Sequence, residues 1–372
     1  MATFLKTTTS YRPGARTMPG RYYTSSDVLA EENERVFARH WICVGREETI
    51  AQPGAFVRVT IAGESLLVLR DRSGVPHAFY NVCRHRGTRL CEEERGTLSS
   101  TIQCPYHAWT YRLDGTLIGA PHMSETPGFA MADYPLHSAA LARWEGFLFV
   151  NLSSDREPFE HAFAPVLRRF ERYNLPLLST VRRIEYKVQA NWKLVMQNYS
   201  ECLHCPTIHP ELSTRLPYNS GANDLVEGSF LGGYMEIKAP NESATMSGRA
   251  CAIPLGELPG HDRSRAYYYT LFPTMMLSLH PDYAVFYTVW PVAAKETRVV
   301  CEWMVHPDAP SKHGYNIADA EEFWDRTNRQ DWHICEQSQL GVSSRVYAPG
   351  PYSPRESIPA AWDREYLRVM GE

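Results

Sequence analysis

The spacing of apolar residues changes along the chain and divides it into two parts. Residues 26–41 begin with capping residues and continue with apolar positions at helical spacing, which predicts a helix. Residues 56–61 and 65–70 alternate between apolar and polar positions around a short turn, as antiparallel strands do. An Asp-Gly pair at 114–115 predicts a further hairpin. We therefore expect a small antiparallel β domain over residues 41–155.

The rest of the chain mixes longer helical and strand patterns. Predicted helices cover 158–173, 192–203 and 319–339, and predicted strands cover 180–188, 266–279, 283–291 and 297–305. Residues 210–265 are rich in Gly, Pro, Asn and Ser and are predicted to form loops. Strands and helices follow one another without a βαβ rhythm, so the fold class is α+β. Residues 1–40 and 156–372 are expected to form a second, larger domain.

Composition excludes several classes of protein. The 372 residues are enough for two domains, and 44% hydrophobic and 22% charged residues are ordinary for globular proteins. A formal net charge of -4 without a basic stripe argues against nucleic-acid binding. No apolar run is long enough to span a bilayer, and the N-terminus lacks the apolar region of a secretory signal. We expect a cytoplasmic protein that binds neither nucleic acid nor membrane.

Cysteine and histidine alternate in two short segments. Cys83-Arg84-His85 is followed, after eighteen intervening residues, by Cys104-Pro105-Tyr106-His107. Two thiolates and two imidazoles in this order can hold two sulfide-bridged irons, with the thiolates on one iron and the imidazoles on the other. A structural zinc site is the alternative, but zinc sites usually keep each ligand pair of one kind. The nine cysteines are an odd number, which in a reducing compartment favours metal binding over disulfides.

Both segments closely resemble the cluster-binding loops of the Rieske ring-hydroxylating oxygenases. The matching runs are Asn81 to Gly87 and Cys104 to Thr110. Respiratory Rieske proteins carry an additional cysteine in each loop, and this chain has no such pair after His85 and His107. The resemblance implies an oxygenase-type or ferredoxin-type [2Fe-2S] cluster on Cys83, His85, Cys104 and His107.

A second group of metal-binding residue types lies about a hundred residues further on. Glu201 and His204 are three residues apart, which would place them on one face of the predicted helix. Pro206 would end or kink that helix and let His209 turn back toward His204. Two imidazoles and one carboxylate form the facial triad that leaves open positions on a non-haem iron.

This segment also resembles the catalytic domain of the Rieske oxygenases. The Asn-Trp-Lys run at 191–193 is followed by Asn198, an acidic residue and two histidines, in the family's order. The resemblance implies that His204 and His209 bind the mononuclear iron. It also implies that Glu201 connects the cluster of a neighbouring subunit to that iron. Glu201 and Asn198 are our candidate catalytic residues.

The third iron ligand is expected on the predicted helix near the C-terminus. Residues 324–336 resemble the second signature of the family, whose aspartate ligand matches Asp331. Asp325 is the alternative. His333 is two positions from Asp331, points elsewhere on a helix, and is expected to be structural.

The resemblance extends over nearly the whole chain and is greatest to the glycine betaine and choline monooxygenase branch. It implies a helix-grip-like catalytic domain with an antiparallel sheet, assembled into head-to-tail homotrimers. It also implies a terminal oxygenase that uses O₂ and electrons from a flavin- or ferredoxin-type reductase. A glutamate at position 201 is found in branches that act on quaternary amines such as carnitine. The expected reaction is hydroxylation of an N-methyl group, which then leaves as formaldehyde.

Two other functions remain open on sequence grounds. An aromatic-ring hydroxylating dioxygenase α subunit would share the metal motifs, but would usually have Asp at position 201. A Rieske electron carrier would not need His204, His209 and Asp331. Residues 213–266 look shorter than in the betaine enzymes, so the substrate could differ. Aromatic residues between 267 and 287 could surround a methylated ammonium or stack on a flat substrate.

Overall fold

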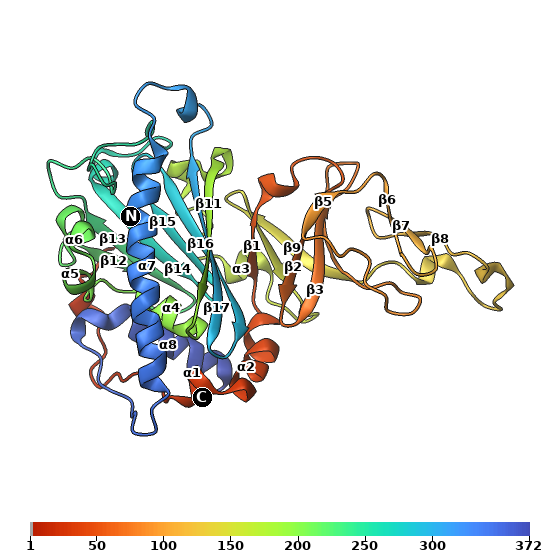
Figure 1. Ribbon diagram of the computed structural model, residues 1–372, viewed down its shortest axis with the longest axis horizontal. Coiled ribbons are helices and arrows are strands. Elements are labelled where there is room, and N and C mark those ends of the chain that lie inside the picture. The colour runs from red at the N-terminus through yellow and green to blue at the C-terminus, as the bar shows by residue number, and fades with distance from the viewer. Residues whose placement is uncertain (1–2) are drawn as a thin grey trace. The chain divides into compact units, whose positions relative to one another are not determined.

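The computed structural model describes residues 3–372, which form two compact units (Figure 1). The small unit is Asn33–Ala162. The large unit contains the described residues up to Glu32 together with Phe163–Glu372. In residues 3–372 no helix is both long enough and apolar enough to cross a membrane. The cytoplasmic location stays a prediction.

The small unit is built from antiparallel strands. A seven-stranded sheet has the order β1-β10-β9-β4-β3-β2-β5, and a three-stranded sheet has the order β6-β7-β8. The strands are β1 (Ile42–Arg46), β2 (Ala55–Ile61), β3 (Glu64–Arg70), β4 (Pro76–Tyr80), β5 (Arg95–Thr97), β6 (Thr101–Gln103), β7 (Thr110–Arg112), β8 (Leu117–Gly119), β9 (Ser138–Trp144) and β10 (Phe147–Asn151). The predicted strands 56–61 and 65–70 are confirmed as β2 and β3. The predicted hairpin connects β7 to β8, and Gly115 in its turn has a φ of 87°.

The large unit contains one seven-stranded antiparallel sheet and most of the helices. Its order is β11-β17-β16-β15-β14-β13-β12. The strands are β11 (Ser179–Val188), β12 (Ala222–Leu225), β13 (Phe230–Glu236), β14 (Arg265–Leu271), β15 (Met275–Leu279), β16 (Ala284–Ala293) and β17 (Glu296–Val305). The helices are α1 (Arg21–Thr24), α2 (Ser26–Glu32), α4 (Trp192–Tyr199), α5 (Cys205–Ile208), α6 (Pro210–Arg215), α7 (Ile317–Val342) and α8 (Ser357–Met370). Figure 1 shows the long helix α7 lying across one face of this sheet. The α+β prediction is confirmed.

Three helix predictions were too long, those at 26–41, 158–173 and 192–203, since α4 ends at Tyr199. Residues 158–173 form only α3 (Phe159–Ala162) and irregular turns. Pro165 has no backbone N–H and its ring clashes with a preceding carbonyl, so a helix cannot continue through it. The helix predicted at 26–41 consists of α2 and a π-helical turn over Asn33–Phe37, and ends there.

The loop prediction for residues 210–265 was wrong in three places, at α6, β12 and β13. Glycine is unfavourable in an isolated strand, but here it allows close contact between strands. A Cβ atom on Gly232 would lie 2.0 Å from the carbonyl oxygen of Tyr268, and one on Gly233 would lie 2.0 Å from that of Ala222. These glycines let β13 pair with β14 on one side and β12 on the other. The sequence analysis also missed α8, which begins after a capping box of Ser353 and Glu356.

Candidate metal centres

The two Cys-His segments of the small unit form loops with the same backbone turn. One loop follows β4 and the other connects β6 to β7. The N–H of Gly87 donates to the carbonyl of Cys83 at 3.0 Å, and that of Ala108 donates to the carbonyl of Cys104 at 3.1 Å. Gly87 and Ala108 each lie four residues after the cysteine and have positive φ values of 75° and 57°. Glycine adopts this conformation readily, whereas alanine does so at a cost in energy.

The four candidate cluster ligands lie together in these loops. The thiols of Cys83 and Cys104 are buried, and the half-buried rings of His85 and His107 have centroids 4.8 Å apart. The Nδ1 atoms of both histidines are buried and have no hydrogen-bond partner among residues 3–372. Unpaired buried nitrogens are costly unless they bind something. Two buried thiols and two unpaired imidazole nitrogens fit a [2Fe-2S] cluster.

Neighbouring side chains hold the cluster loops in position. The hydroxyl of Tyr111 lies 3.4 Å from Cys83 Sγ and accepts a hydrogen bond from the N–H of Arg84 at 3.0 Å. The ring of His85 stacks on Trp109, with centroids 4.9 Å apart and planes 7° apart. The side chain of Asn81 accepts hydrogen bonds from the backbone between the two loops. Burial raises the pKa of the Cys83 thiol, so a bound metal would be needed to keep it deprotonated.

In the large unit, the Asn-Trp-Lys run fixes the start of α4. The side chain of Asn191 caps the helix by accepting a hydrogen bond from the N–H of Lys193 at 3.0 Å. Trp192 donates its indole N–H to Glu32 at 2.8 Å, and Lys193 forms a fully buried ion pair with Glu32. Tyr366 from α8 donates to the same carboxylate at 2.6 Å. This signature is therefore structural and anchors the start of α4.

His204, His209 and Asp331 meet at one point of the large unit. His204 lies just before α5, His209 lies between α5 and α6, and α7 carries Asp331. The Nε2 atoms of His204 and His209 lie 3.2 Å and 2.9 Å from the same oxygen of Asp331. Gln330 accepts a hydrogen bond from His209 Nδ1 at 2.7 Å and so directs its Nε2 inward. The donor set fits a facial triad for iron.

The charges at this point depend on one another. Burial lowers the pKa of His204, but hydrogen bonds to Asp331 and Glu201 raise it to about 10. Burial raises the pKa of Asp331, but hydrogen bonds from His204 and His209 hold it below its usual value. The carboxylate is therefore ionised and favours the protonated form of His204. A metal cation would be attracted by the same carboxylate.

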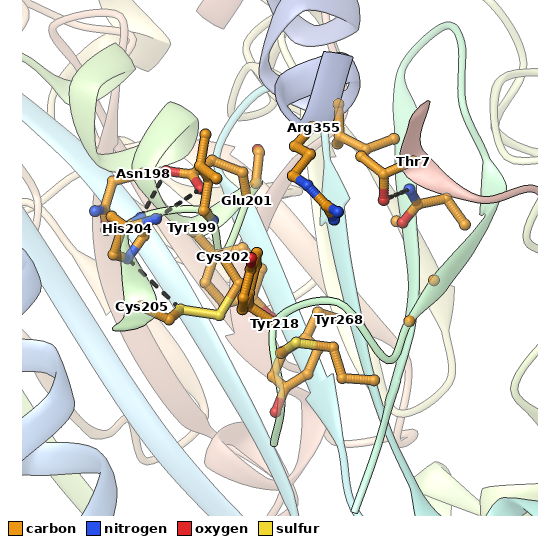
Figure 2. Close-up of a pocket in the computed structure, with 18 of the residues that line it drawn as sticks. Thr7, Asn198, Tyr199, Glu201, Cys202, His204, Cys205, Tyr218, Tyr268 and Arg355 are labelled. Carbon is orange, nitrogen blue, oxygen red and sulfur yellow. Dashed lines mark hydrogen bonds and ion pairs between the residues drawn. A yellow bond between two sulfur atoms is a disulfide. The ribbon is translucent and has the colours of Figure 1, made fainter. Parts of the chain in front are cut away.

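Glu201 contacts His204 through a turn and not along a helix face. α4 ends at Tyr199, so the prediction of a helix through residue 203 was wrong. Glu201 Oε2 accepts hydrogen bonds from the backbone N–H groups of Leu203 and His204, which forms the turn. Glu201 Oε1 accepts a hydrogen bond from His204 Nδ1 at 2.6 Å. Asn198, in the last turn of α4, lines the same pocket (Figure 2).

Asp325, the alternative iron ligand, and His333 do not lie beside His204 and His209. Asp325 accepts a hydrogen bond from Tyr186 at 2.7 Å and pairs with Arg329 at 2.9 Å. His333 is exposed. The structure thus brings Asp331, and not Asp325, to the two histidines.

Cys202 and Cys205 form a disulfide beside His204, which the sequence analysis did not expect (Figure 2). Their Cα atoms are 4.9 Å apart, within the range of ordinary disulfides. Cys205 lies close enough to His204 and His209 to form a metal-binding group with them. Its sulfur is engaged in the disulfide, which leaves Asp331 as the candidate anionic ligand beside the two histidines.

These residues line a pocket of about 1020 Å³, including space open to solvent. Four aromatic side chains line it: Tyr199, Tyr218, Tyr268 and Trp324. Tyr268 lines the pocket, whereas Tyr267 and Tyr269 donate their hydroxyls to Asp262 and Asp224, because neighbouring strand residues face opposite sides. Tyr218 was missed because it falls in the segment predicted as loops. Arg355 was missed because α8 was not predicted.

Comparisons with known proteins decide the family. The model of the ring hydroxylating alpha subunit (catalytic domain) matches residues 176–372, and that of the Rieske [2Fe-2S] domain matches residues 40–135. The chain is a Rieske oxygenase of this family. The glycine betaine monooxygenase oxygenase subunit of Pseudomonas aeruginosa is 30% identical, over 90% of this chain and 84% of the relative. The carnitine monooxygenase oxygenase subunit of Escherichia coli K12 is 37% identical, over 54% of each chain.

Solved structures share the fold. A quaternary ammonium Rieske monooxygenase in complex with L-carnitine has a TM-score of 0.79 at 24% identity, and covers 95% of this chain and 96% of its own. A second structure of such an enzyme, described with inter-subunit electron transfer, has a TM-score of 0.80 at 22% identity and covers 100% of this chain and 99% of its own. Naphthalene 1,2-dioxygenase from Rhodococcus has a TM-score of 0.76 at 19% identity, and covers 95% of this chain and 94% of its own.

Family membership confirms several predictions. This Rieske oxygenase is an oxidoreductase that uses a [2Fe-2S] cluster and a mononuclear iron. It needs electrons from a reductase, as the family does. A Rieske electron carrier is excluded as the function, since the matched catalytic domain makes up the second half of the chain.

Proposed function

We propose that this Rieske oxygenase hydroxylates an N-methyl group of a quaternary amine or betaine, so that the carbon leaves as formaldehyde. The observation that carries the proposal is the pocket itself. His204, His209 and Asp331 lie at the wall of a pocket that four aromatic side chains also line. Aromatic faces attract methylated ammonium groups through cation–π interactions, which are stronger away from water. Similarity to glycine betaine and carnitine monooxygenase subunits supports this substrate class.

We assign the metal ligands from the same geometry. Cys83, His85, Cys104 and His107 would hold the [2Fe-2S] cluster, and His204, His209 and Asp331 would hold the iron. When bound, the cluster supplies single electrons and the iron supplies activation of O₂ beside the substrate. We place the Rieske domain at residues 41–155 and the catalytic domain at residues 1–40 and 156–372.

Glu201 is proposed to connect the two metal centres of neighbouring subunits in a homotrimer. Its carboxylate holds the Nδ1 proton of His204 and thus orients a ligand of the iron. The imidazoles of His85 and His107 are half-buried, whereas the thiols are buried, so the imidazoles are the exit for electrons from the cluster. Inter-subunit electron transfer in a structural relative supports this arrangement. A flavin- or ferredoxin-type reductase would supply the electrons.

The stoichiometry of the proposed reaction determines which reactants and products should be measured. One oxygen atom of O₂ enters the C–H bond of the N-methyl group and the other leaves as water, with two electrons and two protons supplied through the reductase. The N-hydroxymethyl product then breaks its C–N bond and releases formaldehyde.

A substrate screen with a generic reductase tests the proposal. NADH consumption, O₂ consumption and formaldehyde release should rise together with a quaternary amine, and the purified chain should hold about three irons. NADH and O₂ consumption with aromatic substrates alone, without formaldehyde, would refute the proposal in favour of an aromatic-ring hydroxylating dioxygenase.

A further inference from the structure

Arg355 brings an unpaired positive charge into the substrate pocket. It lies in the turn Pro354–Glu356 before α8 and lines the pocket. Its guanidinium forms no ion pair within residues 3–372, and lies over the ring of Tyr218 with Cζ 5.4 Å from the centroid. Figure 2 shows the side chains of Arg355 and His204 on different sides of the pocket. A ligand could therefore extend from the metal centre to this cation.

The other charges of the pocket are already paired. Glu201 is engaged by His204, and Asp331 is engaged by His204 and His209. The sulfurs of Cys202 and Cys205 are joined in the disulfide and carry no charge. Among the described lining residues, Arg355 is the charge that has no counterion. A substrate with a negative group would supply it.

Two buried hydroxyl groups indicate that the ligand also carries oxygen. Tyr268, which is half-buried, and Thr270, which is buried, lie on the same side of β14 and line the pocket. Tyr268 Oη and Thr270 Oγ1 have no hydrogen-bond partner among the residues that the structure describes. Burial raises the pKa of Tyr268 well above its usual value, so its hydroxyl stays protonated and can donate. A purely apolar substrate would leave both groups unsatisfied, at a cost in binding free energy.

We propose that Arg355 binds a carboxylate of the substrate, so that this oxygenase selects zwitterionic betaines over amines that carry only positive charge. The inference rests on the proposed function and names the substrate more narrowly. The ammonium end would face the aromatic rings, and the carboxylate end would pair with the guanidinium in a bidentate hydrogen bond. An amine such as choline would meet the repulsion of Arg355 and would find no free carboxylate in the pocket.

The test compares betaines, which carry a carboxylate, with choline, which does not. The betaines are glycine betaine, γ-butyrobetaine and L-carnitine, and choline is the alcohol that corresponds to glycine betaine. Affinities are measured by calorimetry on the iron-loaded protein, and KM and kcat are measured with a reductase. We expect at least one betaine to bind more tightly than choline. Arg355→Gln should weaken that betaine about tenfold or more, through KM more than kcat, and should not weaken choline.

Two further variants control for charge and for folding. Arg355→Lys keeps the charge but not the bidentate geometry, so it should retain part of the preference for the betaine. Arg345→Gln removes an equally exposed arginine that does not line the pocket, and should change nothing. Circular dichroism and the cluster spectrum of each variant confirm that the fold is intact.

Some results would contradict the role of Arg355. Salicylate and phenol, two aromatic ligands, then show whether the proposed function fails as well. If choline binds as tightly as every betaine, or if Arg355→Gln weakens both equally, the inference is wrong while the proposed function stands. Salicylate carries a carboxylate that phenol lacks, and neither molecule has an ammonium group. If no quaternary amine binds but salicylate binds through Arg355, the carboxylate contact is correct and the proposed function is wrong.

Discussion

The two candidate metal centres are built in opposite ways. In the small unit, two short loops carry all four ligands, each pair within four residues of sequence. The backbone of each loop closes on itself, and the imidazoles are half-buried. In the large unit, His209 is almost fully buried, and Asp331 comes from a helix more than a hundred residues further along the chain. One centre is local and reaches toward the surface, whereas the other is assembled by the tertiary fold inside a pocket.

This difference follows from what each centre must do. A one-electron carrier needs ligands that exchange electrons with partners at its surface, and local loops suffice to place them. An O₂-activating centre must admit substrate and limit water, which requires walls from several elements. Substitutions that affect one centre should therefore leave the other unchanged.

The largest expected effect is that of Glu201→Gln. The amide cannot carry the charge that holds the His204 Nδ1 proton, and the proposed connection between the two centres is lost, so turnover should be abolished. The visible spectrum of the cluster should stay as in the native protein, because its candidate ligands are all in the small unit. Single-turnover assays with the pre-reduced protein measure the effect.

Glu211→Gln is the matched control for this change. Glu211 is an exposed carboxylate on α6 that pairs with Arg326 outside the pocket. The Glu211→Gln variant should retain normal turnover. Unchanged turnover in Glu201→Gln would rule out the proposed bridging role.

The second effect concerns the stability of the large unit. Glu32→Gln leaves the buried ammonium of Lys193 without its counterion and should cost about 3–5 kcal/mol of unfolding free energy. Burial already lowers the pKa of Lys193, which shows that the site is poorly suited to a lone charge. The double variant Glu32→Gln/Lys193→Met should recover part of the loss. Denaturant unfolding followed by tryptophan fluorescence measures it, while the cluster spectrum reports on the small unit. A double variant no more stable than the single one would contradict this account.

The contrast between the centres also explains what the sequence could reveal. The candidate ligands of the cluster could be proposed from the sequence because Cys83, His85, Cys104 and His107 sit in short motifs that need no tertiary information. The strands β2 and β3 could be predicted because their apolar residues alternate. Arg355 and Tyr218 could not be assigned to the pocket, because nothing local connects them. One lies in the turn before α8 and the other follows α6, and they meet only in the folded chain.

Some local patterns were misleading for a physical reason. Gly232 and Gly233 are typical of loops, yet they form a strand because their neighbours approach too closely for any side chain. Glu201 and His204 have helical spacing but meet in a turn, because Glu201 accepts hydrogen bonds from the backbone that follows it. In both cases a tertiary or side-chain interaction outweighed the local preference.

A third and smaller effect concerns the stability of the small unit as a function of pH. Burial raises the pKa of Asp71, but hydrogen bonds from His77, Ser73 and Val75 lower it to about 2, from an ordinary value of 3.8. The stabilisation, about 2 kcal/mol, is fully present above pH 3.8 and is lost as the pH falls toward about 2. Asp71→Asn should reduce the unfolding free energy at neutral pH, and its difference from the native protein should vanish in acid. Asp133→Asn, an exposed aspartate of the same unit, should show no difference at any pH. A constant difference across this range would assign the effect of Asp71 to packing.

The smallest effect is a change in the reduction potential of the cluster. Tyr111→Phe removes the hydroxyl that lies 3.4 Å from Cys83 Sγ. A hydrogen bond to a ligand sulfur stabilises the more negative, reduced form, so its loss should lower the potential by tens of millivolts. Redox titration followed by electron paramagnetic resonance measures the shift. Tyr134 packs against Trp109 in the same cluster of rings, so Tyr134→Phe is the control and should leave the potential unchanged.

The iron centre should keep its affinity for substrate in both variants, because these tyrosines belong to the small unit and the pocket is lined by the large unit. A change in substrate affinity would show that the two centres are coupled more closely than their separate construction implies.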